Sequence, residues 1–276
     1  MASPRPLALI TGASAGIGLE IARILSHDHD LILTARREPE LRAIAAELAP
    51  AVCHVFPADL ADPTAPRKLF DEISAAGLSI DVLVNNAGFG DLGPFAEADL
   101  GKMLRMIQVN VIALTELTGL FLPSLRAKGR GQILNLGSVA GFQPGPYMAV
   151  YYATKAYVNS FSEALSNELG GSGVTVTCLC PGPTVSEFAV VAGVQQLKQF
   201  SVSSAAATRP VAEAGVRAMR RGQRLIITGF RNKLLIFAER FVPRGVVINA
   251  VRSLQDKRRG GKAEGETRRG GEGERN

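Results

Sequence analysis

Tyr151 and Lys155 are the two residues of this chain whose types and spacing most clearly suit proton-transfer chemistry. They stand four positions apart in a segment whose apolar residues recur at helical spacing. A phenol and an ammonium would therefore project side by side from one face of a helix. Ser138 follows a strand-like run, residues 132–136, and could bring a hydroxyl to the same place from the end of a neighbouring strand.

Such a lysine could tune the tyrosine for proton transfer. A free phenol has a pKa of about 10, and work at neutral pH favours a value roughly three units lower, or about 4 kcal/mol. An ammonium about 4 Å away, at an effective dielectric constant near 20, supplies about 4 kcal/mol. The alternative is a half-buried tyrosine beside a solvated lysine. Tyr152 points about 100° away from Tyr151 on a helix, Tyr147 lies near a proline turn, and neither is favoured as the acid.

A glycine cluster offers a place for a cofactor. Residues 11–18 read TGASAGIG and lie between an apolar run and a helical pattern. Glycines at such a junction let the backbone turn tightly and approach a pyrophosphate, which binds at the helix N-terminus. The spacing of Gly12, Gly16 and Gly18 differs from the common Gly-x-Gly-x-x-Gly.

The elements that would hold these residues alternate regularly along the chain. Helical patterns follow the first strand and then cover residues 38–48, 62–76, 98–128, 150–169 and 208–221. Near-continuous apolar strands between helices pair in parallel and are buried on both faces. We therefore predict an α/β protein with a doubly wound parallel sheet of seven strands, a Rossmann fold. The expected strands are residues 7–11, 31–35, 52–56, 81–84, 132–136, 174–180 and 224–228.

Composition supports a single large domain whose basic character lies outside it. The chain has 276 residues and a net charge of +6, but residues 1–230 carry equal numbers of basic and acidic side chains. Residues 231–256 and 257–276 each contribute +3. The basic character therefore says little about the substrate. We expect a catalytic domain at 1–230, an amphipathic helical extension at 231–256 and a disordered Gly/Arg/Glu-rich tail at 257–276.

Metal and membrane signals are weak. Cys53, Cys178 and Cys180 show neither metal spacing nor a disulfide framework and suggest buried thiols in a reducing compartment. The three histidines do not fit a metal site, and His27 and His29 are expected on a surface turn. We expect no signal peptide and no spanning helix. The expected location is cytoplasmic, with possible peripheral contact with the inner face of a membrane.

Taken together, these motifs resemble the short-chain dehydrogenase/reductase family from residue 7 to about residue 229. The family's motifs appear in its usual order and at its usual intervals. They are residues 11–18, Asp59-Leu60, Asn85-Asn86-Ala87-Gly88, Asn110, Ser138, Tyr151-x-x-x-Lys155 and Pro181-Gly182.

The resemblance implies a role for each of these residues. Tyr151 would be the general acid/base, Ser138 would hydrogen-bond the substrate oxygen, and Lys155 would bind the nicotinamide ribose and lower the pKa of Tyr151. Asn110 would kink the long helix and hold a water in a proton relay. Asp59 would meet the adenine ring, and the stretch 85–88 would stabilise the sheet and line the ribose. Cofactor contacts are expected from Gly12, Ser14, Gly16, Ile17, Gly18, Leu60, Asn86, Ala87, Gly88, Pro181, Gly182 and Thr184, where Thr184 and Ser186 replace the family's Val and Thr.

The residues after the second strand indicate which nucleotide is bound. An acidic residue there bonds the ribose 2′-hydroxyl, whereas arginine accommodates a 2′-phosphate. This chain has Arg36 and Arg37, with no acid before Glu38. The alternative is a solvated basic turn. The pattern favours NADP(H), and hence an enzyme that acts as a reductase.

The substrate is less defined. Residues 187–206 contain an apolar set, from Phe188 to Phe200, that could form a lid over an apolar or 3-oxoacyl-type carbonyl or serve as plain packing. We expect an NADP-dependent carbonyl reductase or alcohol dehydrogenase. The alternative is a catalytically idle NADP-sensing protein that acts through partners, although a sensor has no need of the complete set of Asn110, Ser138, Tyr151 and Lys155.

The extension at 231–256 is expected to form two short amphipathic helices separated at Pro243. Val247, Val251 and Leu254 share one helical face, as do Leu234, Phe237 and Phe241 before the proline. Such faces would cover the substrate cleft, pack in a homodimer or homotetramer, or lie in a membrane interface. We rank the membrane after the first two. A nucleic-acid partner is disfavoured because glutamates alternate with the arginines of the tail.

Overall fold

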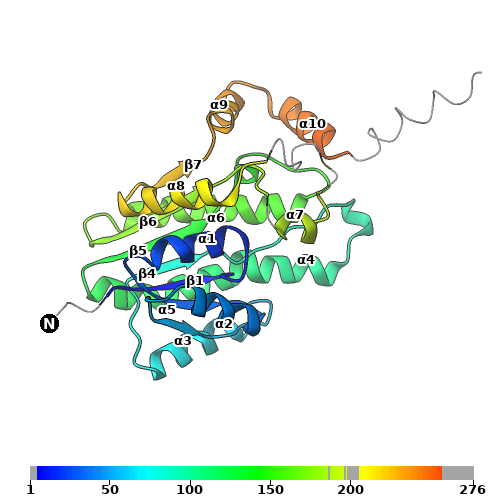
Figure 1. Ribbon diagram of the computed structural model, residues 1–276. Helices are drawn as coiled ribbons and strands as arrows, with labels where there is room; N and C mark the ends of the chain where they lie inside the picture. The colour runs from blue at the N-terminus through cyan, green and yellow to red at the C-terminus, as the bar shows by residue number, and fades with distance from the viewer. Residues whose placement is uncertain (1–4, 186, 196, 198–204, 257–276) are drawn as a thin grey trace, which may run out of the picture.

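Seven parallel strands form the central sheet of the protein (Figure 1). The computed structural model describes residues 5–185, 187–195, 197 and 205–256. Their spatial order is β3-β2-β1-β4-β5-β6-β7, so the predicted doubly wound parallel sheet is confirmed. The predicted strands agree to within one residue at each end. Their bounds are β1 Leu7–Thr11, β2 Asp30–Thr34, β3 Cys53–Val55, β4 Val82–Asn85, β5 Gly131–Leu136, β6 Val174–Cys180 and β7 Leu225–Ile227.

The strand order creates a crevice where the function is expected. The chain runs outward from β1 to β3 and then returns to place β4 on the other side of β1. Crossovers on either side of such a point leave in opposite directions, which opens a crevice at the carboxyl ends of the strands. The glycine segment follows β1, residues 86–88 follow β4, and Ser138 follows β5. All three therefore meet at one edge of the sheet.

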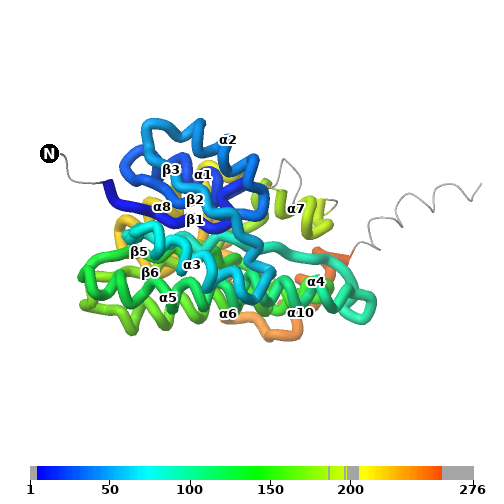
Figure 2. Tube along the Cα trace, turned by 90° about the horizontal axis from the view of Figure 1, so that it is seen from below, coloured from blue at the N-terminus to red at the C-terminus, as the bar shows by residue number. Residues whose placement is uncertain are grey.

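Helices cover both faces of the sheet, and alternate strand residues point to each face. Figure 2 shows α1, α2 and α8 on one side of the strands and α3, α5 and α6 on the other. Ile10 and Leu33 pack with the first group, whereas Leu9 and Ile32 pack with α3 and α5. The strands are thus buried on both sides, as their apolar sequences predict. The helices are α1 Gly16–Leu25, α2 Glu38–Glu47, α3 Ala65–Ala75, α5 Leu114–Ala127, α6 Ala149–Glu168 and α8 Thr208–Arg220.

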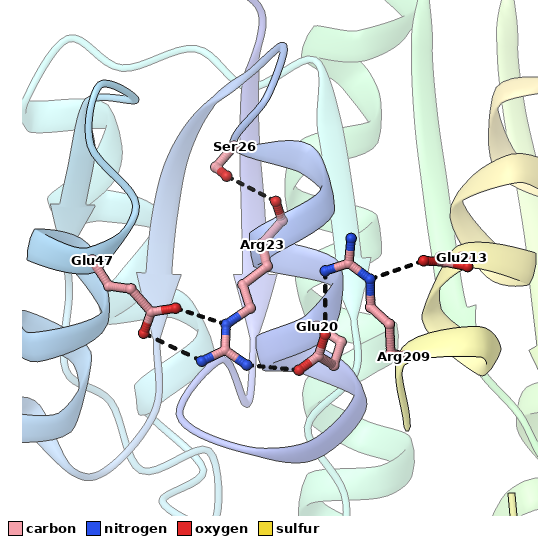
Figure 3. A network of polar contacts seen from close by, with 6 residues as sticks. All are labelled: Glu20, Arg23, Ser26, Glu47, Arg209 and Glu213. Atoms are coloured by element: carbon pink, nitrogen blue, oxygen red, sulfur yellow. Dashed lines mark hydrogen bonds and ion pairs between the residues drawn. The ribbon is translucent and has the colours of Figure 1, made fainter. Parts of the chain in front are cut away.

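An ion-pair network joins the exposed sides of the first group of helices (Figure 3). On α1, Arg23 pairs with Glu20 at 2.7 Å and with Glu47 of α2 at 2.8 Å. Arg209 of α8 reaches Glu20 at 3.4 Å and Glu213 at 2.9 Å. Exposed pairs of this kind contribute little stability individually. They fix the lateral spacing of three helices whose buried faces carry the packing energy.

A single long helical segment, expected at 98–128, runs instead as three joined pieces. They are α4 Leu100–Ile107, a π-helical turn Gln108–Ala113, and α5. The π turn inserts one extra residue per turn and marks many functional sites. By length and composition alone, Leu100–Ala127 could cross a membrane, contrary to the expectation that no segment could. Half of its apolar 18-residue window is buried within the protein, as in the core helix of a soluble fold, so this is weak evidence of a span.

Two helices follow β7, as predicted for the extension. They are α9 Phe230–Glu239 and α10 Arg244–Gln255, which begins directly after Pro243 (Figure 1). No residue of α9 is buried, whereas α10 buries Val251 and Gln255. The predicted apolar face of α10 is only partly correct, because Leu254 is 64% exposed. Ser186, Phe200 and the tail 257–276 lie outside the described residues.

The cysteines and histidines differ in part from expectation. Cys178 and Cys180 are buried free thiols, whereas Cys53 is partly exposed. His29 is buried rather than on the surface, with Nδ1 2.7 Å from Asp28 Oδ1. Within the described ranges, no group of three His, Cys, Asp or Glu side chains could hold a metal ion.

Candidate active site

A cavity of about 660 Å³ lies at the carboxyl ends of the strands. It extends from the glycine segment after β1 to the start of α6 and to α7, Glu187–Val191. Of the predicted site residues, Gly18 and Asn110 lie behind its wall. The others line it: Gly12, Ser14, Gly16, Ile17, Arg36, Arg37, Asp59, Leu60, Asn86, Ala87, Gly88, Ser138, Tyr151, Lys155, Pro181, Gly182 and Thr184.

The glycine segment forms a cradle that only glycine permits. Gly12 has φ +64°, and a Cβ there would lie 2.8 Å from Asn86 Nδ2. A Cβ at Gly18 would lie 2.3 Å from the same nitrogen, so Gly18 acts by close packing and not as a cavity residue. Asn86 Nδ2 donates to the carbonyl oxygens of Thr11 and Gly12 at 2.9 and 3.1 Å. The backbone is therefore held open in front of α1.

The start of α1 suits a phosphate group. The helix has no side-chain N-cap, and its first residues, Gly16 and Ile17, line the cavity. The first N–H groups of a helix carry partial positive charge and bind anions without a side chain. The cradle and the helix terminus together therefore fit a dinucleotide pyrophosphate.

The two arginines after β2 are in different situations. Arg37 Nη2 lies 2.9 Å from Glu187 Oε2 of α7, and Arg37 Nε lies 3.7 Å from Glu40 Oε1. No ion pair joins Arg36 to any other residue that the structure describes. Arg36 is therefore the guanidinium left available for a phosphate. Asp59, further along the same wall, accepts a hydrogen bond from the Ala61 backbone N–H at 3.1 Å.

Buried amides fix the neighbouring strand ends. Asn85 Nδ2 donates to Asn135 Oδ1 at 2.9 Å and to Thr118 Oγ1 at 3.0 Å, which ties β4 to β5 and α5. Thr11 Oγ1 accepts from the backbone N–H groups of Asn86 and Ala87. The expected role of this stretch in stabilising the sheet has a direct structural basis.

Tyr151, Ser138 and Lys155 meet in the cavity as the spacing predicts. Tyr151 and Lys155 lie on α6, with Lys155 Nζ 5.9 Å from the centre of the Tyr151 ring. Ser138 hydrogen-bonds the Tyr151 hydroxyl. Lys155 Nζ donates to the Leu136 carbonyl at 2.6 Å, at the end of β5. A strand end and a helix face thus bring the three groups together.

The pKa of Tyr151 differs from the expectation drawn from the family. Burial raises the pKa of Tyr151 above its ordinary value, and the hydrogen bond from Ser138 offsets only part of that rise. Lys155 does not lower it here, because the Nζ group is directed to the Leu136 carbonyl and is itself desolvated. Burial lowers the pKa of Lys155 to about 8. With protein groups alone, the phenol is held in its neutral, proton-donating form.

Asn110 lies in the π turn and holds the loop after β4. Its Nδ2 donates to Phe89 O at 3.0 Å and to Thr154 Oγ1 at 3.1 Å, and its Oδ1 accepts from Phe89 N at 3.1 Å. The side chain therefore links the π turn, the loop and α6. Oδ1 has a second lone pair that could accept a hydrogen bond from a water molecule. The role of Asn110 in a proton relay stays a prediction.

Comparison with known proteins decides the class. The model of the family described as short chain dehydrogenase matches residues 6–196. The chain belongs to the short-chain dehydrogenase family. This dehydrogenase is 40% identical to sulfoacetaldehyde reductase 2 of Chromohalobacter salexigens over 189 residues, which are 67% of this chain and 75% of that protein. It is 38% identical to an NADP-dependent 3-hydroxy acid dehydrogenase of Salmonella typhi over 64% of this chain and 71% of that protein.

Solved structures agree with this fold. A short-chain dehydrogenase from Sphingobium yanoikuyae in complex with NADPH shares 32% identity and a TM-score of 0.76, covering 86% of this chain and 94% of the other. A bulky-bulky ketone specific alcohol dehydrogenase from Comamonas testosteroni shares 28% identity and a TM-score of 0.74, covering 87% and 94%. The predicted family and Rossmann fold are confirmed.

The cavity of this dehydrogenase also contains residues that the sequence did not single out. Met148, Lys102, Arg105 and Gln255 line it, together with Val191 of the expected lid segment and Tyr152. Helical spacing directs Tyr152 away from Tyr151, yet its ring packs with Tyr151 at a centroid distance of 6.1 Å. Gln255 arrives from the end of α10, more than a hundred residues away along the chain. No local pattern could have indicated that contact.

Proposed function

We propose that this protein is an NADP-dependent reductase of an apolar ketone or 3-oxoacyl-type carbonyl. The observation that carries the proposal is the meeting of Ser138, Tyr151 and Lys155 in one cavity with the glycine cradle. Both the cofactor cradle and a proton donor are needed for carbonyl reduction. Their presence in one continuous space is what a hydride transfer requires.

Each group has a distinct task in this mechanism. Bound NADPH would supply the hydride. The hydroxyl groups of Ser138 and Tyr151 hold the substrate oxygen, and Tyr151 donates its proton to that oxygen as negative charge develops. Lys155 would bind the ribose, with its Nζ group held by the Leu136 carbonyl. Burial of both side chains in a water-poor site strengthens each of these interactions.

The choice of NADP(H) rests on Arg36 and on the relatives. Arg36 lines the cavity and can pair with a 2′-phosphate, a charge-assisted contact. No acidic residue stands at the end of β2 to bind a 2′-hydroxyl. Relatives with NADP or NADPH in their names support the same cofactor.

The substrate end of the cavity favours an apolar compound. Met148, Tyr152, Phe188, Ala189 and Ala192 form a packed cluster beside Tyr151. This cluster supports the predicted lid function of the segment after Pro181. A small polar aldehyde would leave such a wall unfilled, whereas an aliphatic or ring ketone would bury against it.

Turnover tests this proposal directly. Purified protein with NADPH should oxidise the cofactor in the presence of members of a panel of aliphatic, cyclic and 3-oxoacyl carbonyl compounds. NADPH binding with no turnover on any member would instead support the alternative of a nucleotide-sensing protein.

We further infer that the enzyme is a homo-oligomer. We also infer that the exposed apolar face of α9 contacts either a second copy of the chain or a membrane surface. Leu100, Leu104 and Ile112 expose apolar side chains along one helical segment, which suits a contact with a second copy. On α9, Phe230, Leu234 and Phe237 are 81%, 56% and 58% exposed. Basic residues surround them, so peripheral contact with an anionic membrane surface on the cytoplasmic side is the second use we propose for the extension.

A further inference from the structure

The last turn of α10 closes one side of the substrate cavity. Gln255 Nε2 donates to Tyr152 Oη at 2.6 Å, and the Arg252 guanidinium lies 5.6 Å from the centre of the Tyr147 ring. Val251, on the same side of the helix, is 4% exposed. These contacts join the C-terminal extension to the start of α6, one residue away from Tyr151.

The backbone around Tyr147 holds the two tyrosine rings that α10 contacts. Tyr147 has φ +65°, a value that residues other than glycine rarely adopt. Its carbonyl accepts a hydrogen bond from Gly93 N at 2.8 Å, which fixes the turn against the loop after β4. A Cβ at Gly145 would lie 2.2 Å from the Tyr152 ring, so this glycine makes room for that ring. The position of Tyr152 is therefore set by its own surroundings.

Gln255 brings an unsatisfied polar group to the cavity wall. Its side chain is only 2% exposed and lines the cavity. One end of the amide is bonded to Tyr152, whereas Oε1 has no hydrogen-bond partner among the described residues. Buried polar atoms are nearly always paired in folded proteins. Oε1 itself has almost no accessible surface, so a ligand would supply its partner by turning the amide toward the cavity that Gln255 lines.

The surroundings make this amide the distinguishing polar group of its end of the cavity. Burial raises the pKa of Tyr152 to about 12, so its phenol stays neutral. The neighbouring wall is apolar and includes Met148, Phe188 and Val191. The charged groups of the cavity on α4 are engaged elsewhere, because Lys102 pairs with Asp91 and Arg105 pairs with Asp99. A few polar groups in an apolar wall fix the orientation of a ligand and discriminate among ligands.

We propose that Gln255 is a specificity-determining residue, whose amide pairs with a hydroxyl group that the substrate carries remote from its reacting carbonyl. The inference rests on the proposed reductase function and adds the substrate's second polar group to it. A hydroxyl both donates and accepts, so it can pair with either end of the amide. The carbonyl would lie at Ser138 and Tyr151, and an apolar spacer would cross the cluster between the two polar ends.

Binding without turnover tests this proposal. The carbonyl of a ketone added with oxidised NADP cannot be reduced, so its dissociation constant can be measured by calorimetry, and the absence of NADPH absorbance shows that the terminal hydroxyl is not oxidised during the measurement. The probes are straight-chain methyl ketones of graded length, each with and without a terminal hydroxyl group. We expect wild-type protein to bind the hydroxylated member about tenfold more tightly at the length that spans the cavity, as one buried hydrogen bond allows. Gln255→Leu should reduce that ratio to near one without weakening the binding of the plain ketone.

Two further variants distinguish the loss of the Gln255 amide from a general disruption of α10. Tyr152→Phe removes the partner that holds the amide and should also reduce the ratio. Leu254→Ala, at a 64% exposed position of the same turn, should leave it unchanged. The same ratio in wild type and Gln255→Leu, or no preference at any length, would overturn the proposal. A retained preference in a protein that never oxidises NADPH would contradict the reductase function and leave the role of Gln255 standing.

Discussion

At the residue scale, Lys155 is placed where its charge is useful to a reaction and costly to the fold. The side chain is 7% exposed, and burial lowers the pKa of Lys155 from 10.5 to about 8. At neutral pH the folded protein therefore keeps a desolvated ammonium beside the Tyr151 ring. The hydrogen bond from Nζ to the Leu136 carbonyl compensates for only part of its lost hydration. Function, rather than stability, explains a lysine at this position.

The pH dependence of stability should reveal this buried charge. The folded pKa lies below the unfolded one, so between pH 8 and pH 10.5 the unfolded chain binds more protons at this site. The contribution of Lys155 to the free energy of unfolding therefore rises with pH across that window, by about 3 kcal/mol in total. Chemical denaturation of wild type and Lys155→Met at several pH values would measure the difference. Lys68→Met, at an exposed site, should keep the pH dependence of the wild-type free energy of unfolding. The same pH dependence in Lys155→Met and wild type would contradict a buried charge at Lys155.

Arg36 should control the choice of nucleotide. We expect wild-type protein to bind NADPH more tightly than NADH, because the guanidinium pairs with the 2′-phosphate. Arg36→Asp should reverse that order by repelling the phosphate and accepting a bond from the 2′-hydroxyl, with a change in the affinity ratio of roughly tenfold or more. Fluorescence titration of both reduced nucleotides would measure the ratio. Arg42→Asp, on α2 and outside the cavity wall, is the control. Equal affinities of wild-type protein for NADPH and NADH would contradict the proposed role of Arg36.

At the element scale, the alternation of strands and helices could be predicted, but the distortions could not. Strands that are buried on both faces appear in the sequence as short apolar runs. This explains why the predicted bounds of β1 and β6 match the observed bounds residue for residue. The start of α3 was placed three residues early because Asp62 bonds the Thr64 backbone N–H and forms a turn ahead of the helix. The π turn around Asn110 depends on Phe89 and Thr154, which are distant in sequence. Patterns within a window cannot contain such contacts.

The same limit explains the site residues that were missed. Gly12, Ser138, Tyr151 and Lys155 belong to motifs with a local or family signature. The contact of Gln255 with Tyr152 has no such signature, because it arises only when α10 folds back over α6. The pKa of Tyr151 was misjudged for a related reason. The spacing of Tyr151 and Lys155 indicates a charge near the phenol, but the desolvation of both groups depends on the folded surroundings.

Removal of α9 and α10 should affect substrate binding more than cofactor binding. A chain ending after Gly229 loses Gln255 and the cover over Tyr152 but keeps the glycine cradle. We therefore expect the KM for a turned-over ketone to rise severalfold, while the NADPH dissociation constant stays within about twofold of wild type. Steady-state kinetics and nucleotide titration would measure both quantities. An unchanged KM would show that the extension is not part of the substrate site.

A matched variant separates the role of α9 from that of α10. Phe237→Ser combined with Phe241→Ser removes exposed apolar rings without touching Gln255. We expect it to leave KM unchanged and to reduce either sedimentation with anionic vesicles or the size of the oligomer. Loss of vesicle binding alone would identify α9 as the membrane contact. No change in either property would exclude both proposed uses of that surface.

At the scale of the whole molecule, we propose that the fold divides the reaction between two ends of one cavity. The glycine cradle after β1 and the arginines after β2 line the end proposed for the nucleotide, and residues of α6, α7 and α10 line the end proposed for the substrate. The Arg37–Glu187 ion pair spans the two, since it joins the nucleotide site to α7 at 2.9 Å. Tyr151 stands where the ends meet. The topology of the sheet places it there, because Ser138 and the start of α6 both lie at the carboxyl edge beside the crevice.

We propose that Tyr151 transfers the proton in an NADPH-dependent carbonyl reduction. The most direct test is to measure NADPH oxidation and NADPH affinity side by side for wild type and Tyr151→Phe, with one carbonyl substrate from the panel. Removal of a hydroxyl that acts only in the reaction should lower kcat at least about a hundredfold while the NADPH dissociation constant stays nearly unchanged. A Tyr151→Phe variant that oxidises NADPH at close to the wild-type rate would contradict the account.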